Sequence, residues 1–366
     1  MPSGTGSKVL ATLPDVPYVI DPATFAALTE AQDQFLAQTI GDPGANGEAS
    51  FTLPRAGVLS KMRVTFVGQV VISASAAVNP GPRWPYGLLQ RFQMGAGLGN
   101  NPWDCDGLGL AALHATDHPY VSASADEFPG TVGGDSTQLA AGTYPLYLTW
   151  DVPVAVDEVT LIASLFLQSS SNYVNCTITR EAEAQLFGGT PADATITGNF
   201  YVQLSRWKIP VDTQGRLVLP DISRVHVFNK IPVPLLGTGE QPIAVQRTAG
   251  VLQRLFLRAE LTTTSFLSAL PGTATTALID RVALNYGMTE TPKDFSPAGV
   301  LVTLNAEDYG APLPYDTLVF DTLKRNPARD AILLQGVTDL QVRLYPDSGV
   351  TVPAGARVNL FEEILV

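Results

Sequence analysis

The sequence predicts an all-β protein built from jelly-roll sandwiches, with a few short helices. Three observations support this fold class. Apolar and polar residues alternate with a period of two along several segments, as half-buried strands require. The chain contains 32 glycines and 28 prolines, which are typical turn residues between strands. An internal repeat finally indicates two similar domains.

The composition limits the functions that the chain can serve. Only 15% of its 366 residues are charged, against about 25% in average soluble domains. Because 45% are hydrophobic, we expect part of the surface to be covered by other chains. The net charge of −12 argues against direct binding of nucleic acid, which needs clustered cations. Residues 1–14 have no apolar core typical of a signal peptide, and polar residues interrupt the apolar segment 64–78, which excludes a membrane span.

Residues 1–44 are predicted to form an N-terminal arm that contains a helix. Asp21 is a good N-cap, Pro22 suits the first helical position, and Gly41 can end the helix. One face of this helix would be apolar, with Phe25, Leu28, Phe35 and Leu36. This face could pack on its own domain, on a neighbouring molecule or on an underlying layer.

From residue 48 onward the period of two dominates. It predicts strands near residues 61–73, 174–179, 196–204, 254–262 and 340–344. Short helices are expected near Leu108–His114 and Val300–Tyr309. Many strands divided by Gly/Pro turns are typical of jelly-roll sandwiches.

Four short motifs recur in the same order along the chain. The pairs are Ala56–Leu59 with Ala249–Leu252, Leu88–Arg91 with Leu278–Arg281, Leu148–Asp151 with Leu318–Asp321, and Leu167–Gln168 with Leu334–Gln335. Their offset falls steadily, from 193 to 190, 170 and 167 residues. Two copies with different loop lengths produce this pattern. We therefore predict a first sandwich at residues 45–209, and a linker with a second sandwich at residues 210–366.

A metal site would have to use the scarce histidines. His114 and His118 are four residues apart, with Asp117 between them and Asp104 and Asp106 upstream. Pro119 follows directly, and the general-base Glu of a metalloprotease HExxH motif is missing. We interpret both histidines as loop residues and predict no bound metal.

Other motifs carry little chemistry. Gly95–Gly99 lacks the spacing of a dinucleotide loop, Asp104–Gly107 lacks the later ligands of a calcium loop, and Asn175–Thr177 fits a glycosylation sequon without a secretion signal. We expect Cys176 to be a buried thiol and Cys105 to lie in a loop, where it could be exposed. Four acidic residues are interpreted as parts of solvated strand faces: Glu181, Glu183, Glu362 and Glu363. No residue is therefore predicted to be catalytic, cofactor-binding or metal-binding, no cofactor is expected, and the protein is not expected to be an enzyme.

Several segments resemble the double jelly-roll major capsid proteins of tailless, internal-membrane bacteriophages of the tectivirus type. The resemblance begins at Phe51–Val64 and continues through Gly81-Pro82, Leu88–Arg91 and Gly107-Leu108. It is clearest at the predicted domain junction, in Tyr201, Pro210-Val211, Gly215, Leu217, Leu219-Pro220 and Ile222. It covers most of residues 45–230.

The resemblance implies two eight-stranded jelly rolls side by side and a homotrimeric, pseudo-hexagonal capsomer. Such capsomers tile an icosahedral shell around an internal membrane, assembled in the host cytoplasm. Partners would be further copies of the chain, minor capsid or vertex proteins, and the membrane beneath the arm. One departure is that the arm carries Asp15, Asp21, Glu30 and Asp33 but only Lys8 as a cation, which disfavours attraction to anionic lipid.

Two alternatives stay open at the level of sequence. A two-domain jelly-roll hydrolase, or a lectin-like module, could act on glycans. Neither a secretion signal nor a cluster of acidic and aromatic residues near one set of loops supports them.

Overall fold

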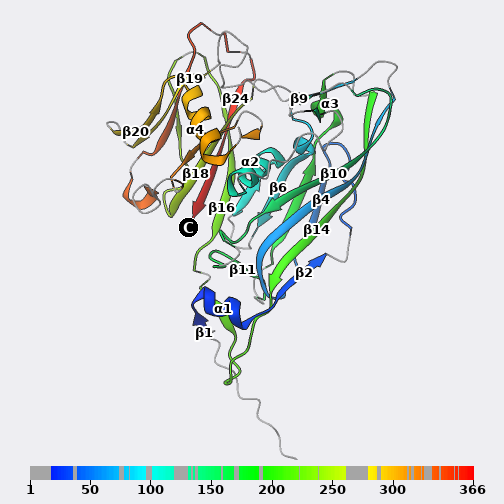
Figure 1. Cartoon of the computed structure of the whole chain (residues 1–366), viewed down its shortest axis with the longest axis vertical. Coiled ribbons are helices and arrows are strands. Elements are labelled where there is room, and N and C mark those ends of the chain that lie inside the picture. Colours follow the sequence, from blue (N-terminus) through cyan, green and yellow to red (C-terminus); the bar gives the residue numbers. More distant parts are fainter. Residues whose placement is uncertain are drawn as a thin grey trace, which may run out of the picture.

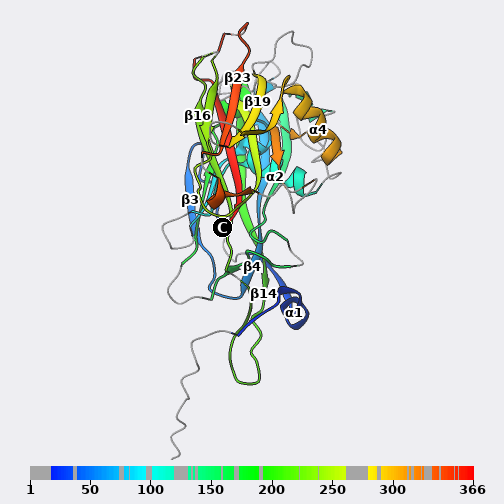
Figure 2. The same cartoon turned by 90° about the vertical axis from the view of Figure 1, so that its left-hand side faces the viewer.

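The computed structural model shows an elongated molecule with two β-sandwiches side by side and the N-terminal elements at its lower tip (Figures 1 and 2). The structure describes residues 18–35, 39–73, 78–81, 83–95, 101–118, 131–132, 135–136, 139–157, 160–168, 173–188, 193–221, 223–237, 239–260, 279–286, 290–310, 313–314, 317–322, 324, 332–337, 339–349, 351–352 and 354–366. Among these residues, no helix is long and apolar enough to cross a membrane.

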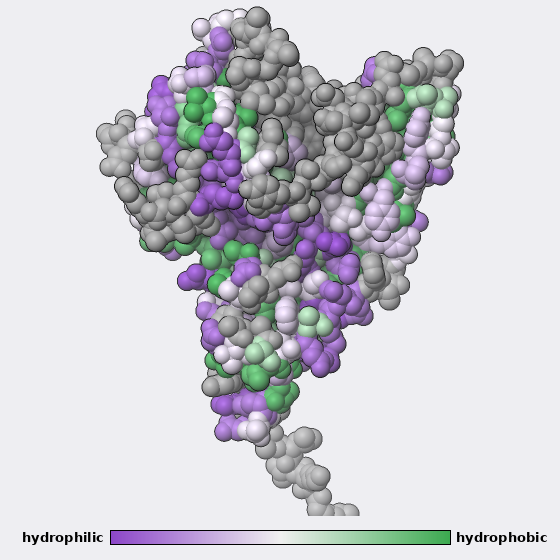
Figure 3. Space-filling model, in the orientation of Figure 1, coloured by the Kyte–Doolittle hydropathy of each residue, from purple (hydrophilic) through white to green (hydrophobic). Residues whose placement is uncertain are grey.

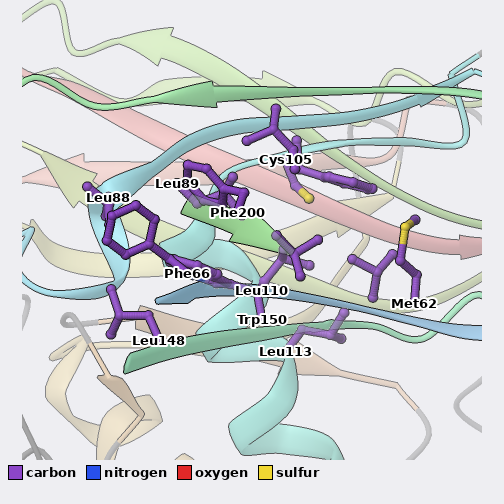
Figure 4. Close-up of a cluster of buried hydrophobic side chains, with 14 of the residues drawn as sticks. Met62, Phe66, Leu88, Leu89, Cys105, Leu110, Leu113, Leu148, Trp150 and Phe200 are labelled. Carbon is purple, nitrogen blue, oxygen red and sulfur yellow. The ribbon is translucent and has the colours of Figure 1, made fainter. Parts of the chain in front are cut away.

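The first sandwich consists of two four-stranded sheets around one apolar core. One sheet has the order β10 (Gly142–Val152), β4 (Val58–Ile72), β14 (Ala194–Trp207) and β2 (Ala31–Phe35). The other has the order β7 (Trp103–Cys105), β6 (Leu89–Gly95), β12 (Asn175–Arg180) and β3 (Glu48–Thr52). Alternate residues of these strands point inward, and Figure 4 shows Phe66, Trp150 and Phe200 among the side chains that fill the core.

The second sandwich repeats this arrangement. One sheet has the order β21 (Thr317–Asp321), β18 (Val251–Glu260), β24 (Arg357–Leu365) and β16 (His226–Pro234). The other has the order β17 (Gln241–Ala244), β23 (Gln341–Pro346), β19 (Ile279–Tyr286) and β20 (Glu290–Phe295). A separate cluster of apolar side chains forms its core. The fold is therefore all-β with two tandem jelly rolls of eight principal strands each, as predicted.

Two helices of three turns accompany the sandwiches. α2 (Gly107–Asp117) and α4 (Gly299–Tyr309) occupy the segments predicted to be short helices. α2 begins at Asp106, whose carboxylate accepts a hydrogen bond from the backbone N–H of Gly109 at 2.7 Å. In each repeat the helix follows β7 or β20 along the chain and comes before β10 or β21.

The remaining elements are short. They are β1 (Tyr18–Ile20), α1 (Pro22–Leu28), β5 (Asn79–Pro80), η1 (Tyr86–Leu88), β8 (Thr131–Val132), β9 (Asp135–Ser136), β11 (Leu165–Phe166), α3 (Glu183–Leu186), β13 (Phe187–Gly188), β15 (Val218–Pro220), β22 (Ile332–Leu333) and η5 (Leu334–Gly336). β1 pairs in parallel with β15, which lies in the segment between the two sandwiches.

Strand pairing confirms the internal repeat at atomic detail. β4 and β18 are equivalent strands, and each has a β-bulge with one unpaired residue. In β4 this residue is Ser60, opposite β14, and in β18 it is Gln253, opposite β24. These two bulges are 193 residues apart, which matches the offset of the first motif pair. A second shared bulge, at Gln90 and Asp280, matches the offset of 190.

One of the motif pairs aligns differently in space. Trp150 pairs with Val64, and Leu318 pairs with Leu257 at the equivalent position of the second sandwich. Leu318 therefore corresponds to Trp150, not to Leu148. The motif identified the correct strands but placed them two residues out of register, because a shift by two keeps the same residues facing inward.

The N-terminal helix is shorter than predicted. α1 ends at Leu28, and residues 31–35 form β2, which pairs antiparallel with β14 over Gln203–Trp207. The edge of β14 offers unpaired backbone groups, and satisfying them overrides the helical pattern of the sequence. Thus β2, although within the range predicted for the arm, belongs to a sheet of the first sandwich. The division of the chain at residues 44 and 209 stays a prediction.

The apolar face predicted for this helix is only partly realised. Phe25 is fully buried against Val58, Leu161 and Leu219 of its own chain. Leu28, in contrast, is 61% exposed. The side chain of Phe35 and all of Leu36 lie outside the described residues.

Candidate functional site

The candidate site is the junction between the two sandwiches, where aromatic and charged side chains of both domains meet. β16 of the second sandwich pairs in parallel with β7 of the first, so one sheet from each domain merges into a continuous sheet. The backbone N–H of Phe228 donates to the carbonyl of Pro102 at 2.8 Å. The two domains are therefore joined by main-chain hydrogen bonds as well as by side chains.

Aromatic residues fill the apolar part of this junction. Phe228, Phe256 and Phe361 project from the second sandwich and join the core cluster of the first, where Trp103 lies. The ring of Phe228 stacks on that of Phe361 with 5.6 Å between their centroids, and its centroid lies 5.7 Å from that of Trp103. Gly109 of α2 permits this approach, because a Cβ atom there would lie 2.4 Å from the Phe361 ring.

Asp106 is the centre of a buried ion cluster. Its Oδ2 accepts hydrogen bonds from Arg258 at 2.9 Å and from Lys230 at 2.7 Å, and its Oδ1 caps α2. Asp106 belongs to the first sandwich, whereas Arg258 lies on β18 and Lys230 on β16. Burial alone would raise the pKa of Asp106, but the two cations outweigh it and hold this pKa far below its usual range.

A second ion cluster lies at the other end of α2. Arg254 on β18 pairs with Glu363 on β24, and its guanidinium also reaches Asp117 at 2.6 Å and Thr116 at 2.7 Å. Burial would raise the pKa of Glu363 and lower that of Arg254. Their mutual attraction reverses both shifts, so that the pKa of Glu363 falls and that of Arg254 rises.

His226 continues the second cluster. Its Nε2 lies 3.0 Å from a carboxylate oxygen of Glu363, and its Nδ1 lies 2.7 Å from the carbonyl oxygen of Pro153. Pro153 follows β10 of the first sandwich, so the ring spans the two domains. Ion pairs thus hold both ends of α2 against the second sandwich, and Asp106, Arg258 and Glu363 within them are almost fully hidden from solvent.

The predicted metal-ligand candidates do not converge. His114 lies within α2 and His118 caps its C-terminal end, so these histidines do not lie in a loop as predicted. Their ring centroids are 4.7 Å apart, but Asp117 pairs with Arg254, and Asp106 pairs with Arg258 and Lys230. Asp104 forms a bidentate pair with Arg91 across β6 and β7. Within the described residues, no three potential ligands gather as a metal site would require.

The structure corrects two predictions about buried groups. Cys105 lies in β7 and is buried, because its strand fills the gap between β6 and β16. Glu181, Glu362 and Glu363 are each 1% exposed and do not belong to solvated faces. Glu181 is compensated by Arg83 at 2.8 Å, and burial raises the pKa of Glu362 to about 7.

The remaining candidates have structural surroundings. Glu183 pairs with Arg180, which is buried and also binds Asp42 at 2.8 Å. Asn175–Thr177 forms part of β12, which is paired on both sides. Gly95 ends β6, and the rest of the glycine-rich loop lies outside the described residues.

Sequence reasoning missed the residues that build the junction. Arg254 and Arg258 occupy alternate positions of an amphipathic strand, which is the usual pattern of a solvated face. Lys230 and His226 lie in a segment without a recognised motif. The signal that could have found them is the repeat itself, since a duplicated sandwich needs one strand face to contact its twin.

Comparisons with known proteins identify the fold. No protein-family profile matches the chain, and no curated protein matches its sequence. A structure of Sulfolobus turreted icosahedral virus superimposes with a TM-score of 0.69 at 17% identity, covering 92% of this chain and 91% of that chain. The PBCV-1 virus capsid superimposes with a TM-score of 0.61 at 11% identity, covering 92% of this chain and 94% of that chain. The major capsid protein P2 from bacteriophage PM2 superimposes with a TM-score of 0.50 at 11% identity, covering 92% of this chain and 98% of that chain. The chain thus has the double jelly-roll fold found in major capsid proteins of viruses.

Proposed function

We propose that this protein is a viral major capsid protein. The observation that carries the proposal is the junction, in which two eight-stranded sandwiches are locked into one rigid unit by buried ion clusters and a shared sheet. Such a unit has a fixed shape, and among the residues that the structure describes we find no group arranged for a reaction. Its function would be geometric, because a lattice needs identical lobes at a constant angle. The similarity to viral capsid folds supports the same role.

We further propose that three copies form a homotrimeric capsomer. Six similar sandwiches would give it a pseudo-hexagonal outline suited to an icosahedral shell. The low fraction of charged residues, 15%, supports extensive contact between copies. Each interface should exceed about 2,000 Å², the range of obligate oligomers. Minor capsid or vertex proteins would close the positions that hexagonal units cannot fill.

The lower tip of the molecule is the part we propose to face an internal membrane. Figure 3 shows a small group of apolar residues there, with hydrophilic residues beside and below it. Val19 of β1, Leu28 of α1 and Val211 before β15 are each more than half exposed. Since Lys8 is the only cation in residues 1–44, this contact would be apolar and not electrostatic. The shell would assemble in the host cytoplasm.

No specific observation favours a glycan hydrolase or a lectin-like module. Glu181 is neutralised by Arg83, and Glu363 by Arg254. Both carboxylates are only 1% exposed, which does not fit a role in contacting a substrate.

Size-exclusion chromatography with light scattering tests the proposal. A mass of three chains that persists on dilution is the expected result. Electron microscopy of the purified protein should then show hexagonal particles or sheets. A folded monomer at micromolar concentration would exclude the capsomer.

A further inference from the structure

The two strands that join the sandwiches within the chain have counterparts that end their sheets. Arg91 forms a bidentate pair with Asp104 on β7, and Arg281 forms the same pair with Asp294 on β20. This shared pair identifies β20 as the counterpart of β7. Yet β7 lies inside a sheet, between β6 and β16, whereas β20 is the last described strand of its sheet.

The same relationship holds for β16 and β2. Phe228 on β16 pairs with Glu363, and Asp33 on β2 pairs with Ser205. Glu363 and Ser205 are equivalent, because each lies opposite the residue that directly follows the shared bulge, Arg254 on β18 and Lys61 on β4. Asp33 is therefore the counterpart of Phe228. β16 is paired on both sides, whereas β2 ends the described part of its sheet.

Register extends this equivalence to single residues across the junction. Within the chain, Phe228 lies opposite Trp103 in the parallel pair of β16 and β7. Trp103 pairs with Met94, and its counterpart Lys293 pairs with Leu284. The counterpart of the Phe228–Trp103 contact is thus Asp33 beside Lys293. These residues carry opposite charges, although nothing within one chain brings them together.

These two edges, which have no further paired strand among the described residues, cannot meet inside one molecule. Figure 1 shows β20 and β2 on opposite flanks of the molecule. Residues 31–34 of β2 are all exposed, as are Thr291 and Asp294 of β20. An exposed edge with unpaired backbone groups is a template for pairing with another chain.

We infer that β20 of one copy pairs in parallel with β2 of the next copy, repeating between chains the junction that β7 and β16 form within a chain. α4 then lies at this interface as α2 lies at the internal one. The contact is heterologous, and three copies joined in this way give six sandwiches with six similar junctions. The inference rests on the proposed capsomer and names the strands that build it.

Charge and local bonding fit this arrangement. Asp33 accepts a hydrogen bond from Ser205 at 2.6 Å, and Lys293 donates to the backbone carbonyl of Asp321 at 2.6 Å, so both side chains are held against their own sheets. Opposite charges at facing positions favour this register over the like-charge alternatives. Because the free edges carry polar residues where the internal junction has Phe228 and Trp103, the chain can stay soluble before it assembles.

Cysteine cross-linking tests the register directly. Opposite residues on neighbouring strands lie about 5 Å apart, within the range of a disulfide. The double variant Asp33→Cys/Lys293→Cys should oxidise to a covalent ring of three chains on a non-reducing gel. The control Asp33→Cys/Ser50→Cys places the second thiol on β3, at the far edge of the other sheet, and should give no such ring. Cys105 and Cys176 are buried and stay reduced in both proteins.

The outcomes separate this inference from the proposed function. A trimer by light scattering without a specific cross-link overturns the strand pairing but leaves the capsomer intact. A monomer in every variant overturns the capsomer itself. Charge reversal gives an independent measurement: Asp33→Lys or Lys293→Asp alone should weaken the trimer at least tenfold in dissociation concentration, and the double reversal should recover most of this loss. Absence of recovery contradicts the pairing of these two residues.

Discussion

Arg258 and Asp106 are each 1% exposed and pair through two hydrogen bonds, of 2.9 and 3.3 Å, across the boundary between the sandwiches. Their partner Lys230 comes from a third element, β16. A buried ion pair adds little to stability over a well-packed apolar contact, but it penalises any arrangement that separates its members. The pair therefore fixes the relative position of the domains, which is the property that a lattice subunit needs.

Replacing Asp106 should be among the most damaging single changes in the chain. Asp106→Asn leaves Arg258 and Lys230 without their anion in a buried site, and we expect a loss of about 3–5 kcal/mol in the free energy of unfolding. Chemical denaturation measures it. The matched control is Asp104→Asn, two residues away, which removes the exposed pair with Arg91 and should cost about 0–1 kcal/mol. Equal losses in both variants would contradict the role of the junction.

Much of the fold follows from the sequence because strand periodicity and the repeat act together. The alternation at residues 61–73 reflects β4, and the motif at Ala249–Leu252 locates β18 by its offset. The N-terminal helix was overestimated because Asp21 and Pro22 are strong helix-start signals, whereas the pairing of β2 with β14 is a tertiary effect. Local propensity carries no information about a sheet edge that is distant in sequence, such as Ser205, which lies 172 residues after its partner Asp33.

The junction was less accessible to sequence reasoning. Arg254 and Arg258 look like solvent-facing residues, since a strand has the same alternation whether its polar face meets water or another domain. Glu363 has the same ambiguity on β24. Only the structure shows that Arg258 and Arg254 face the other domain, where they pair with Asp106 and Asp117.

α1 offers a test of the N-terminal segment with a control on the same helix. Phe25 is fully buried among Val58, Leu161 and Leu219, so Phe25→Ala should lower the free energy of unfolding by about 3–5 kcal/mol. Leu28→Ala changes an exposed side chain and should have an effect within about 0.5 kcal/mol. Thermal and chemical denaturation measure both. If Leu28→Ala instead impairs only shell assembly, the tip contacts another layer, as proposed above.

The two cysteine thiols should react much more slowly in the native protein than in the unfolded protein. Both are free and buried, and burial raises the pKa of each thiol well above its usual range, so little reactive thiolate forms. Without reductant, a thiol reagent at pH 8 should find no fast-reacting group in the native protein. After denaturation it should find two per chain. A fast-reacting thiol in the native state would place Cys105 in an exposed loop after all.

Glu362 marks a difference between the two repeats. It lies on β24 opposite Leu255, at the position that Leu204 occupies on β14 opposite Met62. Leu204 is part of the first core, so the second sandwich carries a carboxyl group where the first has a leucine. Glu362 accepts a hydrogen bond from the backbone N–H of Gln246 at 2.7 Å. Burial raises its pKa to about 7, and this hydrogen bond and Arg247 oppose the shift.

This raised pKa predicts how stability depends on pH. Because the folded protein holds the proton up to about pH 7, whereas the unfolded chain releases it near 4.5, Glu362 contributes stability that is complete below pH 4.5 and is lost as the pH rises to about 7. The full loss is roughly 3 kcal/mol, at about 1.4 kcal/mol per pKa unit. Asp106 and Glu363 have lowered pKa values and act in the opposite direction, so their stability is lost on acidification. Asp106 and Glu363 are unchanged in the variant Glu362→Gln, so comparing the native protein with this variant removes their contribution.

Denaturation at pH 5, 6, 7 and 8 should show the native protein losing stability relative to Glu362→Gln up to pH 7 and no further. A constant difference across this range would mean that Glu362 keeps its usual pKa in the folded chain.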